Sequence, residues 1–86
     1  MKHYIGEINT YFGESEISTM VKFKTDGDPF DYLDSIASKF WGDENQYEFD
    51  VGMYNFGDRV AGVGRWQEVD ADTYNKVSII VEVRND

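Results

Sequence analysis

The sequence predicts an α+β fold: one domain over residues 1–86, in the order ββαβββ, with one helix packed on one face of an antiparallel sheet. Residues 25–42 carry apolar side chains at the three- and four-residue spacing of an amphipathic helix. Several other segments alternate apolar and polar residues, as half-buried strands do. Runs of strands with one helix indicate an α+β domain whose helix lies across the sheet.

The predicted helix has signals at both ends. Asp28 is placed to accept hydrogen bonds from the free N–H groups of the first turn, and Pro29 follows where its missing N–H costs nothing. Gly42 suits the left-handed conformation that ends many helices. The apolar face comprises Phe30, Leu33, Ile36, Ala37, Phe40 and Trp41, of which Phe30, Leu33, Ala37 and Phe40 are expected to face the sheet.

The two segments before the helix predict a β-hairpin. Residues 2–12 and 15–24 read as strands, and residues 13–14 form a tight turn between them. Alternation is regular in the second segment, which predicts one buried and one exposed face. The expected buried side of that strand carries Ile17, Thr19, Val21 and Phe23.

Two strands and a turn are expected after the helix. A polar connection over residues 42–46 leads into a third strand over residues 47–54, where apolar and polar residues again alternate. Residues 55–58 carry a turn signal. A fourth strand is predicted over residues 59–68.

The C-terminal part predicts a short connection and a last strand. Residues 69–76 are polar and indicate a loop or one short helical turn capped by Asp70. Residues 77–84 predict a fifth strand, with Val77, Ile79, Val81 and Val83 on one side. Because Ile80 lies on the opposite side, this strand is expected to be central.

Charge is the unusual feature of the composition. Seventeen acidic residues oppose eight basic ones, for a net charge of −9. Such a field repels nucleic acid and anionic membranes and attracts basic protein surfaces. The simpler interpretation is that acidic surfaces keep small proteins soluble.

Composition also indicates a cytoplasmic protein. The chain has no cysteine, which removes disulfides and thiolate catalysis and suits a reducing compartment. No apolar run approaches the roughly 20 residues that span a bilayer. The first residues carry no apolar core of a signal peptide.

No pattern of reactive or metal-binding side chains in the sequence predicts catalysis, a cofactor or a metal site. The single histidine, His3, has no cysteine nucleophile to act with. Neither Asp26, Asp28 and Asp31 nor Asp70 and Asp72 have the spacing of a calcium loop. Turn formation and helix capping account for Asp26, Asp28, Asp70 and Asp72 without a metal. We therefore expect a protein that is not an enzyme.

A Gly-x-Gly sequence, Gly62 to Gly64, lies inside the predicted fourth strand. A phosphate-binding loop would need a helix directly after the glycines, and none is predicted there. We expect instead a close backbone approach, with an aromatic ring such as that of Trp41 lying over the bare sheet. The same strand face is assigned to Val60 and Trp66.

The aromatic residues are too many for the core of so small a domain. Some are expected at exposed turns, where aromatics beside acids suit a protein–protein interface. The alternative is a second small cluster under the loops. The predicted partner-binding residues are Asp26, Asp31, Asp34, Asp43, Glu44, Tyr54, Phe56, Asp58, Asp70 and Asp72.

In size, acidity, lack of cysteine and α+β architecture, the chain resembles the small phage-encoded anti-defence proteins, the anti-CRISPR and anti-restriction inhibitors. This resemblance covers the whole chain and rests on no residue motif. It implies an inhibitor that acts in the host cytoplasm. Several members of this class occupy the basic nucleic-acid channel of a defence nuclease. Unlike the nearly all-acidic DNA mimics, the chain has cations scattered among its acids: Lys22, Lys24, Lys39, Arg59 and Arg65.

These observations predict a non-enzymatic acidic protein that binds a basic protein surface, such as that of a nucleic-acid-binding defence complex, and inhibits it. A second hypothesis is a small assembly protein that dimerises or docks through an exposed sheet face or edge. A third, an antitoxin or immunity protein for a basic nuclease, shares the physics of the first. We expect a monomer or homodimer that binds neither nucleic acid nor membrane directly.

Overall fold

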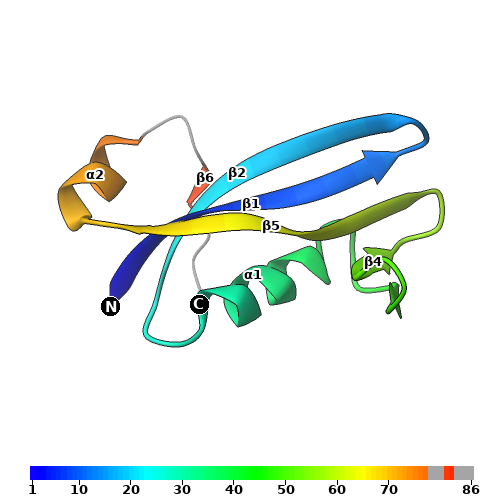
Figure 1. The fold of residues 1–86 in the computed structure, drawn as a ribbon, viewed down its shortest axis with the longest axis horizontal. Coiled ribbons are helices and arrows are strands. Elements are labelled where there is room, and N and C mark those ends of the chain that lie inside the picture. Colours follow the sequence, from blue (N-terminus) through cyan, green and yellow to red (C-terminus); the bar gives the residue numbers. More distant parts are fainter. Residues whose placement is uncertain (78–80, 83–86) are drawn as a thin grey trace.

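A computed structural model describes residues 1–77 and 81–82. It shows a long twisted sheet with α1 below it and α2 at one end (Figure 1). The fold class is α+β, as predicted, but the order ββαβββ is wrong, because the chain runs ββαβββαβ. The elements are β1 (Lys2–Phe12), β2 (Ser15–Thr25), α1 (Pro29–Ala37), β3 (Gln46–Glu48), β4 (Met53–Asn55), β5 (Arg59–Val69), α2 (Ala71–Lys76) and β6 (Val81–Glu82).

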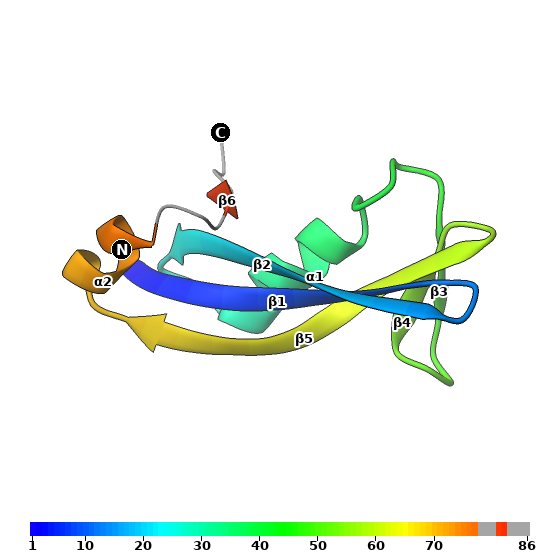
Figure 2. The same cartoon turned by 90° about the horizontal axis from the view of Figure 1, so that it is seen from above.

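Three long strands form the body of the sheet, whose order is β3-β4-β5-β1-β2-β6 (Figure 2). The predicted hairpin of β1 and β2 is confirmed, and its register runs from Lys2 opposite Thr25 to Phe12 opposite Ser15. Two residues close the hairpin, and Gly13 has the positive φ of 62° that such tight turns favour. Strand β5 pairs with the other edge of β1.

The start of α1 follows the sequence signals. Asp28 is the N-cap, its Oδ1 accepting from the Phe30 N–H at 2.9 Å, and Pro29 is the first helical residue. The helix ends at Ala37, earlier than predicted, and the chain continues in tight turns. Gly42 has the predicted positive φ, 112°, but it lies beyond these turns. Phe40 and Trp41 therefore reach the core from outside the helix.

One cluster of buried side chains lies between α1 and the sheet. Leu33 and Ala37 are fully buried there, as predicted. The ring of Phe30 lies 5.8 Å from that of Trp66 between centroids, but Phe30 remains 43% exposed, so it faces the sheet only in part. The buried core residues are Tyr4, Ile8, Val21, Phe23, Leu33, Ala37 and Ala61.

A β-bulge changes which residues of β5 share a face. Gly6 lies opposite Trp66, whereas Ile8 lies opposite Val63, so β5 holds one extra residue between the two pairs. Trp66 consequently lies on the α1 side of the sheet. The prediction that Trp66 shares a face with Gly62 is wrong, because periodicity alone does not reveal the bulge.

The predicted third strand over residues 47–54 is also wrong. Strands β3 and β4 form a short hairpin instead, with Tyr47 opposite Tyr54. Gly52 closes the turn with a φ of 67°, and its N–H donates to the Glu48 carbonyl at 2.8 Å. The next predicted turn, at residues 55–58, is confirmed by the positive φ of Gly57, 106°.

Residues 69–76 contain the short helix α2, one of the two predicted alternatives. Asp70 caps it, with Oδ1 accepting from the Thr73 N–H at 2.7 Å. The buried Tyr74 lies with its ring 5.0 Å from that of His3, on the sheet face opposite α1. Lys22 donates to the Tyr74 carbonyl at 2.9 Å and so ties α2 to β2.

The last strand differs from its prediction in both position and direction. Strand β6 pairs parallel with β2 at the end of the strand order, so it is not central. Residues 78–80 and 83–84 of the predicted strand lie outside the described residues.

Candidate protein-binding surface

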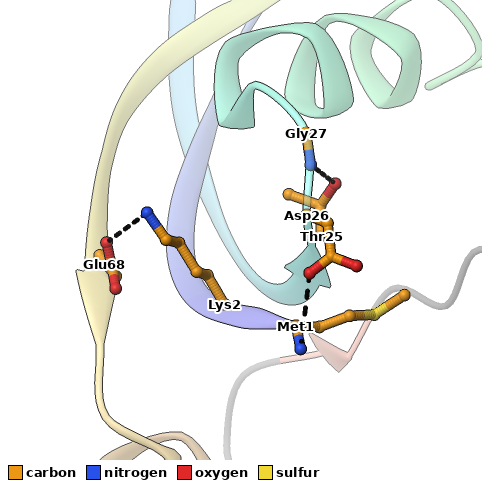
Figure 3. Close-up of polar contacts among 6 residues, drawn as sticks. All are labelled: Met1, Lys2, Thr25, Asp26, Gly27 and Glu68. Carbon is orange, nitrogen blue, oxygen red and sulfur yellow. Dashed lines mark hydrogen bonds and ion pairs between the residues drawn. The ribbon is translucent and has the colours of Figure 1, made fainter.

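The predicted acidic residues do not gather on one surface. Asp26, Asp70 and Asp72 lie at the α2 end of the molecule, and the β3–β4 hairpin lies at the other end (Figure 1). Asp26 forms an ion pair with the amino group of Met1, drawn in Figure 3, at a distance of 3.5 Å. Asp70 caps α2, and Asp72 pairs with Lys76 at 2.9 Å. Local ionic or capping roles therefore account for these three carboxylates.

A second group of carboxylates lies along α1 and the connection that follows it. Asp31, Asp43 and Glu44 are exposed. Within the part of the chain that the structure describes, no cation is within ion-pair distance of these three side chains. Asp58, by contrast, contacts the neighbouring Arg59 at 3.2 Å. The charge of the first three is thus free to act on a partner.

The tip of the β3–β4 hairpin exposes large apolar side chains. Phe49 is 89% exposed, and Val51 is 60% exposed. The ring of Tyr47 lies 4.9 Å from that of Phe49 and 4.9 Å from that of Tyr54, so three aromatic rings form a continuous row. Contiguous apolar groups left in solvent commonly mark interaction sites.

A hydrogen bond attaches this row of rings to α1. The Tyr54 hydroxyl donates to Asp34 Oδ2 at 2.7 Å. Donation to a carboxylate, with smaller effects of burial and of the negative charge itself, raises the pKa of Tyr54 to about 12. The bond joins the hairpin to the helix and sets the aromatic row beside the acidic residues of α1.

We name the set Asp34, Tyr47, Phe49, Asp50 and Tyr54 the aromatic–carboxylate surface. Its rings offer apolar area and its carboxylates offer acceptors for arginine or lysine, a combination that suits a basic protein partner. Phe56, also predicted to bind a partner, is half-buried and packs its ring 5.7 Å from that of Trp41. It lies at the edge of the core, outside this surface.

Sequence reasoning missed three members of this surface: Tyr47, Phe49 and Asp50. Aromatic and acidic residues alternate through residues 47–50, a pattern that predicts a strand. Gly52 was the available signal for a turn, because isolated glycines inside a strand pattern often break it.

No protein-family model, curated protein or solved structure matches this chain. In the described residues, no helix is long and apolar enough to cross a membrane. The same residues contain no group of three or more His, Asp or Glu side chains placed to hold a metal ion. The chemistry of the exposed surfaces is therefore the basis on which we infer a function.

Proposed function

We propose that this chain is a non-enzymatic binding protein that docks its aromatic–carboxylate surface on a basic protein surface and inhibits the partner by occupying it. The observation that carries the proposal is Phe49, which is 89% exposed, lies against the ring of Tyr47 and is followed in the chain by the exposed carboxylate of Asp50. A solvent-exposed phenylalanine lowers solubility and makes no core contact. We therefore expect its side chain to be buried against a partner in a complex.

The partner is expected to be a nucleic-acid-binding protein, such as a defence nuclease or surveillance complex. Surfaces that hold phosphate backbones are rich in lysine and arginine. A chain with a net charge of −9 is attracted to such a surface before contact. Occupation of that surface would then exclude the nucleic acid.

The two parts of the surface have separate roles in this proposal. Carboxylates near the interface speed association and make it sensitive to salt. Aromatic side chains that become buried in the complex slow its dissociation. Charge and ring substitutions should therefore affect different rate constants.

The partner is first identified by capture from a host lysate, and its binding is then measured by surface kinetics at two salt concentrations. One variant combines D43N and E44Q, whose carboxylates lie in the connection after α1. The matched control combines D26N and D72N, which remove the same net charge at the α2 end. The molecule is 38 Å long, well beyond a Debye length of about 8 Å at physiological salt, so the two sets are distinguishable.

The first variant should associate more slowly than the control and show a shallower dependence on salt. Equal effects of both variants would mean that only the overall charge matters. Unchanged association for the first variant would contradict the electrostatic part of the proposal.

Exposed apolar side chains also favour a second candidate, an assembly protein that forms a homodimer. Phe49 and Val51 at the hairpin tip, with Ile17 at 57% exposed on β2, offer apolar contacts for another copy. Sedimentation across a range of protein concentrations tests this candidate. An apolar dimer should persist at high salt, whereas the acidic complex with a basic partner should weaken.

A further inference from the structure

The sheet face opposite α1 carries a hollow of about 320 Å³. It lies between β1, β2 and β5, on the other side of the sheet from Tyr54 and Asp34. Its lining combines apolar side chains with polar ones, among which Glu7 supplies the one carboxylate. The residues that argue for its chemistry are Ile5, Glu7, Met20, Arg65, Gln67 and Val69.

Glu7 is the largely buried acid of this hollow. Its side chain is only 14% exposed, and it stands at the β-bulge between β1 and β5. Gly64 makes room for it, because a Cβ at position 64 would lie 2.9 Å from Glu7 Cγ. Gly64 of the Gly-x-Gly sequence thus leaves space for a carboxylate. A phosphate-binding loop would not place a negative charge there, because it would repel the phosphate.

Glu7 has a poor counterion in the part of the chain that the structure describes. Arg65 Nη2 lies 3.9 Å from Glu7 Oε2, and the Arg65 side chain is 93% exposed. A pair this long and this exposed is expected to contribute little. The remaining 14% exposure of the Glu7 side chain leaves its carboxylate accessible to a second, closer cation.

We propose that this hollow receives the side chain of an arginine from a partner protein. The guanidinium would pair with the Glu7 carboxylate, and the methylene stem would pack against Ile5, Met20 and Val69. One carboxylate offers too few ligands for a divalent cation, which takes six or more oxygens. The loose contact with Arg65 shows that the carboxylate is within reach of a guanidinium.

This site goes beyond the proposed function, because it lies on the opposite face of the sheet from the aromatic–carboxylate surface. It also changes the role of Arg65. That side chain competes for Glu7 from within the chain, so its removal should favour the incoming arginine.

The test is a titration of the ¹⁵N-labelled protein with N-acetyl-arginine methylamide, followed by NMR. Saturable shifts are expected at the backbone amides of Glu7, Gly64 and Gln67. The citrulline analogue is the matched control, because it has nearly the same shape without the charge, and it should cause no saturable shift. Absence of saturation with the arginine probe, or equal binding of both probes, would overturn the proposal.

Two variants separate a binding role of Glu7 from a structural one. E7Q keeps the shape of the side chain and should weaken binding at least about tenfold, the usual value of a charged hydrogen bond. R65A should strengthen it. E14Q, in the exposed hairpin turn, is the control and should bind as the natural chain does. If E7Q does not fold, R65A alone tests the binding role of Glu7. Binding of the arginine probe by R65A that is weaker than, or equal to, that of the natural chain would overturn the proposal.

Discussion

Leu33 of α1 packs directly over Gly6 of β1. A Cβ at position 6 would lie 2.8 Å from both methyl carbons of Leu33 and 3.1 Å from Cε1 of Phe23. The distances to Leu33 are shorter than real Cβ contacts and the distance to Phe23 is tighter than most, so a side chain at position 6 would force these two buried side chains to shift. The close packing of α1 on the sheet thus depends on the absence of a Cβ at Gly6 in β1.

Replacement of Gly6 by alanine should therefore destabilise the protein. Overpacking of a well-filled core typically costs about 1–3 kcal/mol. Urea denaturation measures the loss. G27A is the matched control, because a Cβ there would meet only Thr25 Oγ1 at 3.6 Å. Equal midpoints for G6A and G27A would mean that α1 does not rest on Gly6.

Replacement of Leu33 by alanine should cost about 2–5 kcal/mol, as for other buried leucines. Leu33 is fully buried between α1 and the sheet. S35A in the same helix is the control, since Ser35 is exposed and its hydroxyl bonds only the Tyr32 carbonyl. An unchanged thermal midpoint in L33A would contradict the position of the helix.

The ends of α1 show what the sequence can and cannot predict. Asp28 and Pro29 act on the first turn beside them, so the start of the helix was predictable from local chemistry. The end was not, because Trp41 is held by distant groups. Its ring contacts the ring of Phe56 at 5.7 Å and the guanidinium of Arg59 at 5.2 Å. Apolar spacing alone therefore extended the predicted helix too far.

The candidate surfaces, too, were predictable from the sequence only where local chemistry decides. Exposed acids such as Asp31 and Asp43 were predictable, because carboxylates rarely lie in a core. The exposure of Phe49 depends on the turn that Gly52 closes, which alternation conceals. The burial of Glu7 depends on the pairing of β1 with β5 and on the bulge. Strand pairing is non-local, so no pattern within one segment reveals it.

The hydrogen bond between Tyr54 and Asp34 predicts a loss of stability at alkaline pH. The pKa of Tyr54 is raised from 10.0 to about 12. Because this pKa is higher in the folded than in the unfolded state, the protonated Tyr54 contributes its full stabilisation below pH 10. That contribution is lost as the pH rises through about 12. The free energy of unfolding should fall across this window, and urea titrations at several pH values measure it.

Y54F is the control for this effect. It lacks the titrating phenol, so the part of the fall due to Tyr54 should be absent. Tyr11, whose pKa is also raised through its hydrogen bond to Glu16, is retained in both proteins and cancels from the comparison. Identical pH profiles for Y54F and the natural chain would show that the bond does not form.

The cap of α2 predicts a titration at acid pH. The Thr73 N–H donates to Asp70, and this bond holds the pKa of Asp70 below its ordinary value of 3.8. Because the folded pKa is lowered, the cap stabilises α2 above the ordinary pKa and is lost as the pH falls through the folded value. The amide proton shift of Thr73 should report this transition in NMR spectra recorded against pH.

D70N is the matched control for the acid titration. Asparagine caps a helix about as well as aspartate and does not titrate, so the Thr73 shift should then lose its acid inflection while α2 persists. An inflection at or above the ordinary aspartate pKa in the natural chain would contradict the capped geometry.

The last prediction concerns Phe49, whose side chain is 89% exposed. F49S should change the free energy of unfolding by no more than about 0.5 kcal/mol, as exposed substitutions do. It should raise the rate of dissociation from a basic partner and leave the salt dependence of association unchanged, because no charge is removed. Surface kinetics measure both rates. I17S is the control, since it removes another exposed apolar side chain, on β2 and outside the aromatic–carboxylate surface. Equal dissociation rates for F49S and I17S would exclude the hairpin tip from the interface and leave the carboxylates as its main contacts.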